Sequence, residues 1–334
     1  MKRKTSALIM TALWGLLAAG LNHGCFAQTG TSTADAYPTK PIRLVVPFAP
    51  GGVTDTSGRI VAEGLSRRLN QQVIIENKPG ASGNIGAQLV STAAPDGYTL
   101  LLALDGTLVI NPHAYEKVGF NALKDFAPVA KLGDSIIILV ANPNQPFKTL
   151  KEMVAASKTN PQGLSFGTSG NGSITHVAGE LLKEKSGANM VHIAYKGGGP
   201  AAADVTAGHT PLAFSSASSV SQYIQSGKLV ALGVPSAKRS VAFPDIPTFA
   251  ESGISGVELN SWVGILAPAG TASSIIEKLN REINAVLADP AVKERLLVSG
   301  IIAAQGSSAD FAQEIQKDYA LYGKVIEQAG IKVN

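Results

Sequence analysis

The chain has 334 residues, of which 45% are hydrophobic and 16% are charged. This composition suits a globular protein with a sizeable core and excludes a disordered chain, and the length predicts one large or two ordinary domains. Its 28 Lys and Arg residues outnumber its 24 Asp and Glu residues, but Lys2, Arg3 and Lys4 lie at the very start. Without these three the balance is 25 minus 24, or +1, which gives no electrostatic case for a nucleic-acid partner.

Residues 1–27 have the parts of an export signal. The early cations precede an apolar run, Ala7–Leu21, and small residues follow it. We therefore predict cleavage near Ala27–Gln28 and a periplasmic product. An uncleaved anchor and a lipoprotein attached through Cys25 are alternatives, but the apolar run is shorter than the roughly 20 residues that a span needs. Cleavage would remove Cys25, the single cysteine, and with it any disulfide or thiol nucleophile.

Strand and helix patterns alternate after Pro41. Apolar runs predict strands at Ile42–Val46, Val73–Glu76 and Thr99–Ala103, with helices ending near Asn70 and Ala93 between them. This alternation is typical of a parallel sheet with helices on both faces.

The alternation starts again at Ile136 and builds a second α/β unit. A further strand follows in "NSWVGILAPAG", and two more helices are predicted near Ser273–Leu287 and Asp310–Gln328. The first unit is short of helices, so a chain that builds the second unit and then returns is the economical arrangement. We predict one lobe from 38–127 and 259–334, and another from 128–258, with a hinge where the chain crosses twice.

Turns rich in Gly, Ser, Thr and Asn follow strands in both units. Ligands of open α/β sheets bind beyond the carboxyl ends of the strands, so these turns are the candidate site. They offer backbone N–H and hydroxyl donors and few charges, which favours binding over acid–base chemistry. The turns are Ala49–Asp55, Leu104–Thr107, Thr168–Ser173, Lys196–Gly199 and Ser215–Ser219.

The first of these turns contains Gly51 and Gly52, which can take positive φ and allow a ligand close to the backbone. A tight turn without a ligand is the alternative. Asp55 and Arg59 follow at a spacing of four, which predicts an ion pair within a helix in preference to a ligand contact.

The stretch "GTSGNGSITH", residues 167–176, suggests a second function. An exported hydrolase could use Ser169 or Ser173 as nucleophile and His176 as base. Against it, the stretch is not GxSxG, no acid is apparent to orient His176, and a histidine one turn into a helix more often packs or caps. The histidines are scattered and no nucleotide motif occurs, so neither a metal nor a cofactor is predicted.

Motifs in a fixed order carry a resemblance from about Tyr37 to the C-terminus. They include "YPTKPIRLVVPFAPGGVTD", "IIENKPGASGNIGA", "PDGYTLLL", "SFGTSGNGSITHVAGELL" and "AYKGGGPAAADVTAG". The chain resembles the periplasmic solute-binding proteins of tripartite tricarboxylate transporters, often called Bug proteins. The resemblance implies an α/β, two-lobed type II periplasmic-binding fold, each lobe a mainly parallel sheet flanked by helices. It also implies a monomeric, non-enzymatic protein that holds a small carboxylate between its lobes for a membrane permease or a sensor.

The same resemblance implies a set of ligand-binding residues. Ser215 and Ser216 replace the acidic or amide side chains that are common in the family, and Pro211 stands where an Asp is usual, which argues against an amino-acid ligand. The implied residues are, in the first lobe, Pro50, Gly51, Gly52, Val53, Thr54, Asp55, Gly106 and Thr107, and, in the second, Thr168, Ser169, Gly170, Asn171, Ser173, Tyr195, Lys196, Gly197, Ser215 and Ser216.

Overall fold

The computed structural model describes residues 37–259, 261–328 and 330–333. The predicted export signal and its cleavage site lie outside these residues. In the described part of the chain, none of the helices combines the length and the hydropathy that crossing a membrane requires.

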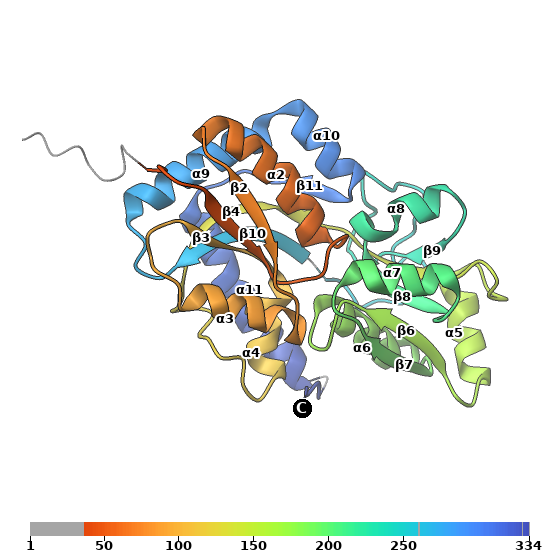
Figure 1. Ribbon diagram of the computed structural model, residues 1–334. Coiled ribbons are helices and arrows are strands. Elements are labelled where there is room, and N and C mark those ends of the chain that lie inside the picture. Colours follow the sequence, from red (N-terminus) through yellow and green to blue (C-terminus); the bar gives the residue numbers. More distant parts are fainter. Residues whose placement is uncertain (1–36, 260, 329, 334) are drawn as a thin grey trace, which may run out of the picture.

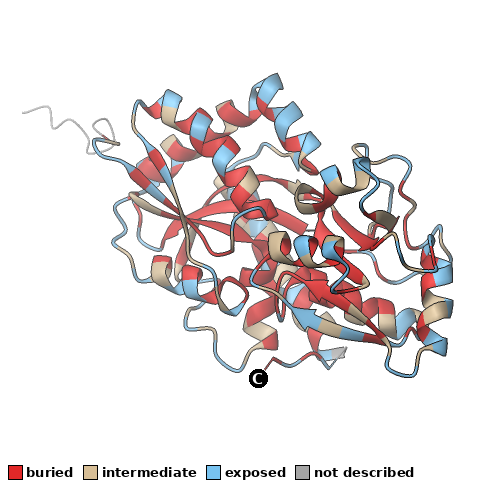
Figure 2. Ribbon diagram, turned by 45° about the vertical axis from the view of Figure 1, so that its right-hand side comes forward, coloured by how far each residue is buried: buried red, intermediate tan, exposed pale blue. Residues whose placement is uncertain are grey.

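Two sheets divide the described chain, and Figure 1 shows the one built from the two ends of the chain beside the one built from its middle. The first has six strands in the order β11-β4-β10-β3-β1-β2. The residues of β1, β3 and β10 are mostly buried, and Figure 2 shows these strands between layers of helix whose outer faces are exposed. The strands are β1 (Ile42–Val46), β2 (Val73–Asn77), β3 (Thr99–Leu104), β4 (Phe126–Ser135), β10 (Ser261–Pro268) and β11 (Ile301–Ala303).

The helices of this first lobe come from both ends of the chain. Apolar residues at helical spacing, such as Leu279, Ile283 and Val286, face the sheet and lie in its core. The helices are α2 (Val53–Leu69), η1 (Ala81–Gly83), α3 (Asn84–Ser91), η2 (Gly106–Ile110), α4 (Asn111–Ala114), α9 (Ser273–Ala288), α10 (Pro290–Val298) and α11 (Ser308–Gln328).

The second lobe is built from the middle of the chain, with the strand order β7-β6-β8-β5-β9. Its strands are β5 (Ile137–Ala141), β6 (Leu164–Thr168), β7 (Met190–Ala194), β8 (Leu212–Ser216) and β9 (Val230–Gly233). Its helices are α5 (Leu150–Thr159), α6 (Ile174–Ser186), α7 (Gly198–Ala207) and α8 (Ala217–Gln225).

The α/β class with two helix-flanked sheets is confirmed, and in each sheet most strands run in the same direction: β1, β2, β3 and β4 in the first, and β6, β7, β8 and β9 in the second. Pairs β1–β2, β1–β3, β6–β7 and β6–β8 are parallel, whereas β10 and β11 in the first sheet and β5 in the second pair antiparallel with their neighbours. The parallel strands follow helical crossovers.

The predicted lobe boundary at residues 127 and 128 falls inside β4, which pairs with β10 along its whole length from Phe126 to Ser135. β4 ends at Ser135, and β5 of the second sheet begins two residues later, at Ile137. We therefore propose that the lobes divide at Ile136, and that the return crossing lies between β9 and β10.

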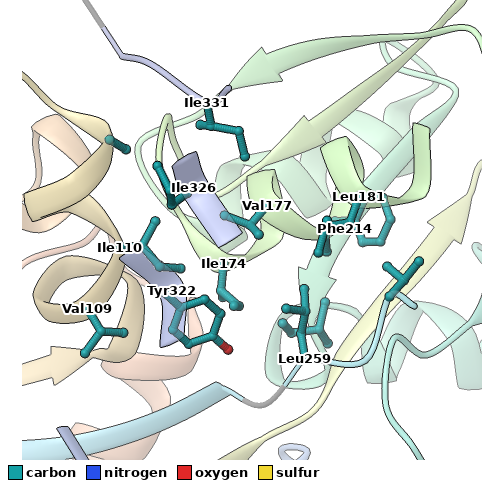
Figure 3. Close-up of a cluster of buried hydrophobic side chains, with 14 of the residues drawn as sticks. Val109, Ile110, Ile174, Val177, Leu181, Phe214, Leu259, Tyr322, Ile326 and Ile331 are labelled. Carbon is teal, nitrogen blue, oxygen red and sulfur yellow. The ribbon is translucent and has the colours of Figure 1, made fainter. Parts of the chain in front are cut away.

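One cluster of buried apolar side chains continues from the first lobe into the second. Figure 3 shows Ile174 and Val177 of α6 gathered with Ile110 of η2 and Tyr322 of α11. All four are buried, with at most 3% of the surface exposed. Burial of apolar surface between the lobes stabilises the closed arrangement that the structure shows.

Candidate functional site

The N-termini of four helices converge on one small cavity between the lobes, named here the inner cavity. Its wall includes the first residues of α2 and α6, the first residue of α7 and the N-cap of α8. Each helix start carries free N–H groups and about half a positive charge, which together favour an anion. These four contributors are Val53, Ile174, Gly198 and Ser216.

The inner cavity has a neutral wall with two kinds of side chain. Hydroxyl groups provide donors, and the hydroxyl of Ser135 has no hydrogen-bond partner among the described residues although it is buried. The cavity measures only about 20 Å³, roughly the space that one water needs, so a larger molecule requires the lobes to move apart. The wall consists of Phe48, Val53, Leu104, Ile137 and Ile174, of Ser135, Ser169, Thr175, Ser216 and Ser261, and of Gly52 and Gly198.

A second space, named here the outer cavity, adjoins the inner one through Phe48 and Ser169, which line both. It measures about 200 Å³ and lies between η1 and Tyr115 of the first lobe and residues 169–171 and 194–196 of the second. Three cavities of about 380, 350 and 580 Å³ are larger. The first lies between α6 and α11, and the third lies in the second lobe beside residues 148–151 and 251–253. The cavity of about 350 Å³ lies beside residues 235–241 and shares Ser135, Ile137 and Ser261 with the inner cavity. We identify the inner cavity as the candidate site because the helix starts meet there.

The turn before α2 is held by its own side chains. Gly51 takes a φ of 86°, as expected for a turn glycine, whereas Gly52 has a φ of −85° that any residue can adopt. The Asp55 carboxylate accepts hydrogen bonds from the Gly51 N–H at 3.1 Å, from Asn77 at 3.1 Å and from two nitrogens of Arg59 at 2.9 and 3.1 Å. The predicted Asp55–Arg59 ion pair is thus confirmed, and Asp55 stabilises the turn from inside.

Asp55 has a lowered pKa that links this turn to pH. Burial alone would raise the pKa of its carboxyl, but the hydrogen bonds from Arg59, Gly51 and Asn77 outweigh burial and hold that pKa below its ordinary value. A lowered pKa in the folded state adds stability above the unfolded value of about 3.9, and this contribution disappears as pH falls through the folded value.

Replacing Asp55 by asparagine should lower the free energy of unfolding by about 1–2 kcal/mol at pH 7, because charged hydrogen bonds are lost but the exposed Arg59 is partly screened by water. The difference from the wild type should shrink as the pH falls below about 4. Denaturant unfolding at a series of pH values measures it, with Asp245→Asn at an exposed position as the control. A difference that stays constant over this range would show that the charge of Asp55 contributes nothing.

The turn before α6 is closed by a network of hydroxyl groups. The Ser173 hydroxyl caps the helix by accepting from the His176 N–H at 3.3 Å and donates to the Gly170 carbonyl at 2.7 Å. The Ser169 and Thr175 hydroxyls lie 2.9 Å apart and both residues line the inner cavity. The sequence TSGNGSIT thus forms a capped helix start with hydroxyl groups on the cavity wall.

His176 is not arranged as a base for either serine. Its Nδ1 accepts from the Gly172 N–H at 3.1 Å, and its ring stacks on His192 at 3.8 Å. Its Nε2 lies 3.7 Å from Glu180, so the expectation that no acid accompanies His176 was wrong. The acid lies one turn further along α6, where helical spacing hides it from a motif search. Both ring nitrogens are occupied, so the serine–histidine pair of the hydrolase alternative does not form.

This packing lowers the pKa values of both Glu180 and His192. Burial would raise the pKa of Glu180, but His176 and Lys183 outweigh it and bring that pKa to about 2. Burial, followed by the neighbouring His176, lowers the pKa of His192 to about 3, so His192 is neutral at pH 7. Its Nε2 lies 2.6 Å from the Thr168 hydroxyl, which places both residues in the support behind the cavity.

Backbone of the two lobes meets directly along a seam beside the inner cavity. The Ala49 N–H donates to the Lys196 carbonyl at 3.1 Å, and the Ser219 hydroxyl donates to the Gly51 carbonyl at 3.1 Å. A Cβ atom on Gly199 would lie 2.7 Å from the Pro50 carbonyl oxygen, closer than real contacts allow. Glycine is therefore required at this position for the lobes to close this far.

A clasp joins the lobes at the outer cavity. The carbonyl of Asn171 in the second lobe accepts hydrogen bonds from the hydroxyls of Ser82 and Tyr115 in the first, at 2.7 Å for Tyr115. Ala81 and Ser82 take positive φ values of 45° and 52°, an uncommon conformation for residues other than glycine. That conformation places Ser82 against Asn171.

Replacing Tyr115 by phenylalanine should speed ligand dissociation about 2- to 12-fold, because one hydrogen bond worth about 0.5–1.5 kcal/mol is lost only from the closed state. The association rate should change less. Stopped-flow binding measures both rates, and Tyr223→Phe on α8 controls for the loss of a hydroxyl elsewhere. An unchanged dissociation rate would show that the clasp does not hold the closed state.

The predicted site residues fall into three groups. Gly52, Val53, Ser169 and Ser216 line the inner cavity. Ser169, Gly170, Asn171, Tyr195 and Lys196 line the outer cavity. The others support the seam or the turns: Pro50, Gly51, Gly106 and Gly197 lie at interlobe backbone contacts, and Thr54, Asp55, Thr107, Thr168, Ser173 and Ser215 bond or pack behind the walls.

Several wall residues were missed by sequence reasoning. Gly198 and Leu104 lie within the predicted turns Lys196–Gly199 and Leu104–Thr107 but were not among the implied ligand-binding residues, and Ser261 lies in the quoted "NSWVGILAPAG". Ser135 and Ile137 flank Ile136, where we propose that the lobes divide, whereas the sequence pattern predicted a boundary at residues 127 and 128. Phe48 and Ile174 are apolar, and nothing in the sequence separates them from core residues.

Two α/β lobes that meet over a donor-lined cavity define the class of two-lobed solute-binding proteins. The sequence model of the "Tripartite tricarboxylate transporter family receptor" matches residues 58–331. The chain therefore belongs to this family, whose members are periplasmic binding proteins, and the predicted resemblance is confirmed. BugT of Bordetella pertussis is 36% identical over 306 residues, which cover 90% of this chain and 93% of BugT.

Solved structures agree with this assignment. An R. palustris protein solved with adipate is 31% identical, has a TM-score of 0.86, and the match covers 89% of this chain and 99% of that one. MatC from Rhodopseudomonas palustris, solved with bound malate, is 29% identical with a TM-score of 0.83, and the match covers 87% of this chain and all of that one.

Proposed function

We propose that this protein is an exported solute-binding protein whose lobes close on a small carboxylate and deliver it to a membrane permease or a sensor. The convergence of four helix N-termini on the inner cavity carries this proposal, because it concentrates N–H donors and positive potential where no buried acid competes in the wall. Two structural relatives were solved with carboxylates, adipate and malate, which supports the same class of ligand.

The hydroxyl groups of the wall suit the same ligand. A carboxylate accepts several hydrogen bonds, and charge-assisted bonds are the stronger ones. Ser135 retains an unused donor, and Ser169, Ser216 and Ser261 lie on the same wall. Apolar neighbours such as Leu104 and Ile137 would cover the carbon skeleton of the ligand.

The protein acts by capture and release rather than by catalysis. A hydrolase would need a serine hydroxyl bonded to a free imidazole nitrogen, and the nitrogens of His176 are engaged by Gly172 and Glu180. Among the described residues no cluster of acids, histidines and cysteines could hold a metal ion. We propose that the protein works as a monomer in the periplasm after removal of residues 1–27.

A thermal-shift screen of the mature chain against small carboxylates tests the proposed function. A ligand present at 100 times its dissociation constant should stabilise the protein by about 2.7 kcal/mol, a shift of a few degrees. Mass spectrometry should then recover the bound acid chemically unchanged. Carboxylates of varied size that all leave the melting temperature unchanged would contradict the proposal, as would steady conversion of the bound acid.

A further inference from the structure

A buried carboxyl group lies behind the wall of the inner cavity. It belongs to Asp105, which directly follows β3 and has none of its surface exposed. Its Oδ1 accepts from the Gly106 N–H at 2.7 Å and from the Ser261 hydroxyl at 3.3 Å, and the Trp262 backbone N–H also donates to the carboxyl. Its Oδ2 has no hydrogen-bond partner among the described residues. If the carboxyl were ionised, this oxygen would carry uncompensated buried charge, which is costly.

The charged group of α11 that acts on Asp105 is a second acid, Asp318. The Asp318 carboxylate accepts from the Trp262 indole N–H at 2.8 Å, so Trp262 joins the two acids through its backbone and its ring. β10 itself contributes no charged side chain. Burial raises the pKa of the Asp105 carboxyl well above its ordinary value, its hydrogen bonds oppose this shift, and Asp318 adds to it.

The cations on the surrounding elements do not offset the charge of Asp105. Lys131 of β4 and Arg239 of the cavity of about 350 Å³ each bind a glutamate, at 2.6 and 2.8 Å, and Lys131 also binds Asp134 of that cavity at 2.8 Å. Lys238 of the same cavity is exposed to solvent. On α6, the ring nitrogens of His176 face a backbone N–H and a glutamate. Within the described ranges, Asp105 forms no ion pair.

Ser261 connects this carboxyl group to the candidate site, because it lines both the inner cavity and the cavity of about 350 Å³. While Asp105 is ionised, the Ser261 hydroxyl donates to it and presents only lone pairs to the inner cavity, where they repel a carboxylate. Once Asp105 is protonated, backbone N–H groups still satisfy its Oδ1, and the Ser261 hydroxyl can turn to donate to the ligand. The larger cavity has room for water beside Ser261, which gives the proton a route from solvent.

We infer that Asp105 takes up a proton when the lobes close on an anion, and that Ser261 transmits this change to the ligand by reversing the direction of its hydrogen bond. This inference rests on the proposed function, which places the carboxylate in the inner cavity. Protonation and anion binding strengthen each other, because the proton removes a like charge. The pKa of Asp105 is therefore higher in the closed, liganded protein than in the open one. Affinity is complete below the open-state pKa and falls as the pH rises toward the closed-state pKa.

Calorimetric titrations of the mature protein test this inference between about pH 6 and 8.5, where small carboxylates are themselves ionised. The ligand is adipate, or the acid that gives the largest shift in the thermal screen. Titrations in buffers of different ionisation enthalpy count the protons, and the wild type should take up as much as one proton per ligand. Its affinity should fall by up to about 10-fold per pH unit.

Three variants assign the proton. Asp105→Asn has a permanently neutral side chain of the same shape, so its affinity should stay within about 2-fold over this range, with no proton uptake. Asp318→Asn keeps an acceptor for the Trp262 indole but removes the second acid, so the fall in affinity should move to lower pH. Asp245→Asn, at an exposed position, should behave like the wild type.

The results separate this inference from the proposed function. If the wild type binds a carboxylate with constant affinity and without proton uptake, the inference is wrong although carboxylate capture stands, and this result needs no variant. If the pH dependence persists in Asp105→Asn, another group takes up the proton and the role of Asp105 is wrong. If the wild type binds no carboxylate at any pH, the proposed function itself fails.

Discussion

Replacing Gly199 by alanine should weaken carboxylate binding about 5- to 150-fold while leaving the unliganded lobes as stable as before. The new Cβ would lie 2.7 Å from the Pro50 carbonyl oxygen and 3.3 Å from the Gly51 carbonyl carbon, both in the opposite lobe. Overpacking of this kind costs about 1–3 kcal/mol, and the cost arises only when the lobes close.

The melting temperature of the free protein distinguishes impaired closure from a general loss of stability in Gly199→Ala. Gly199 lies in the first turn of α7, where alanine is the better helix former, so the melting temperature of the free protein should stay equal or rise. Gly306→Ala is the matched control, because a Cβ there would be 3.8 Å from its nearest neighbour. Calorimetry with a ligand from the screen measures affinity. Wild-type affinity in Gly199→Ala would show that ligand capture does not need this degree of closure.

Replacing Gly52 by valine should reduce carboxylate affinity at least about 10-fold, the factor that corresponds to 1.4 kcal/mol. A Cβ at Gly52 meets ordinary contacts, at 3.7 Å from the Gly198 nitrogen, but the two methyl groups of valine would enter a cavity of about 20 Å³ and cover the N–H groups at the start of α2. The reason is steric, because the φ of −85° suits valine.

Gly52→Ala separates the two effects of this substitution. Both variants lose a favourable helix N-cap residue, which costs roughly 1 kcal/mol of stability, but alanine fills less of the cavity. Affinity should therefore fall in the order wild type, alanine, valine, while both variants lose similar stability in denaturant unfolding. Equal affinity in wild type and Gly52→Val would place the ligand away from the inner cavity.

The fold followed from local patterns wherever those patterns were strong. Ile42–Val46 and the helix that ends at Leu69 were predicted within one or two residues, because an apolar strand, a glycine turn and a helical repeat follow one another. β4 was missed, since "FAPVAKLGDS" alternates only weakly and contains proline and glycine. α10 and β11 were missed because they are short and depend on packing against α9 and β4.

The candidate site was predictable in its polar part only. The helix starts of α2, α6 and α7 could be predicted from the turns that follow strands. Glycine, serine and asparagine occur there because turns and helix caps require them, and such requirements can be recognised from neighbouring residues alone. The contribution of the apolar wall residues Phe48 and Ile137 depends on how the two lobes meet, which no local pattern encodes. Glu180 beside His176 was missed for a related reason, as helical geometry brings together residues that a linear motif keeps apart.

The central claim is that a carboxylate binds where the four helix N-termini converge. A crystal structure of the mature protein grown with adipate tests it most directly. We predict the carboxylate within hydrogen-bond distance of the backbone at Gly52 and Gly198 and of the hydroxyls of Ser169 and Ser216. Adipate bound instead in the cavity lined by residues 235–241, with the inner cavity still closed on itself, would contradict the claim.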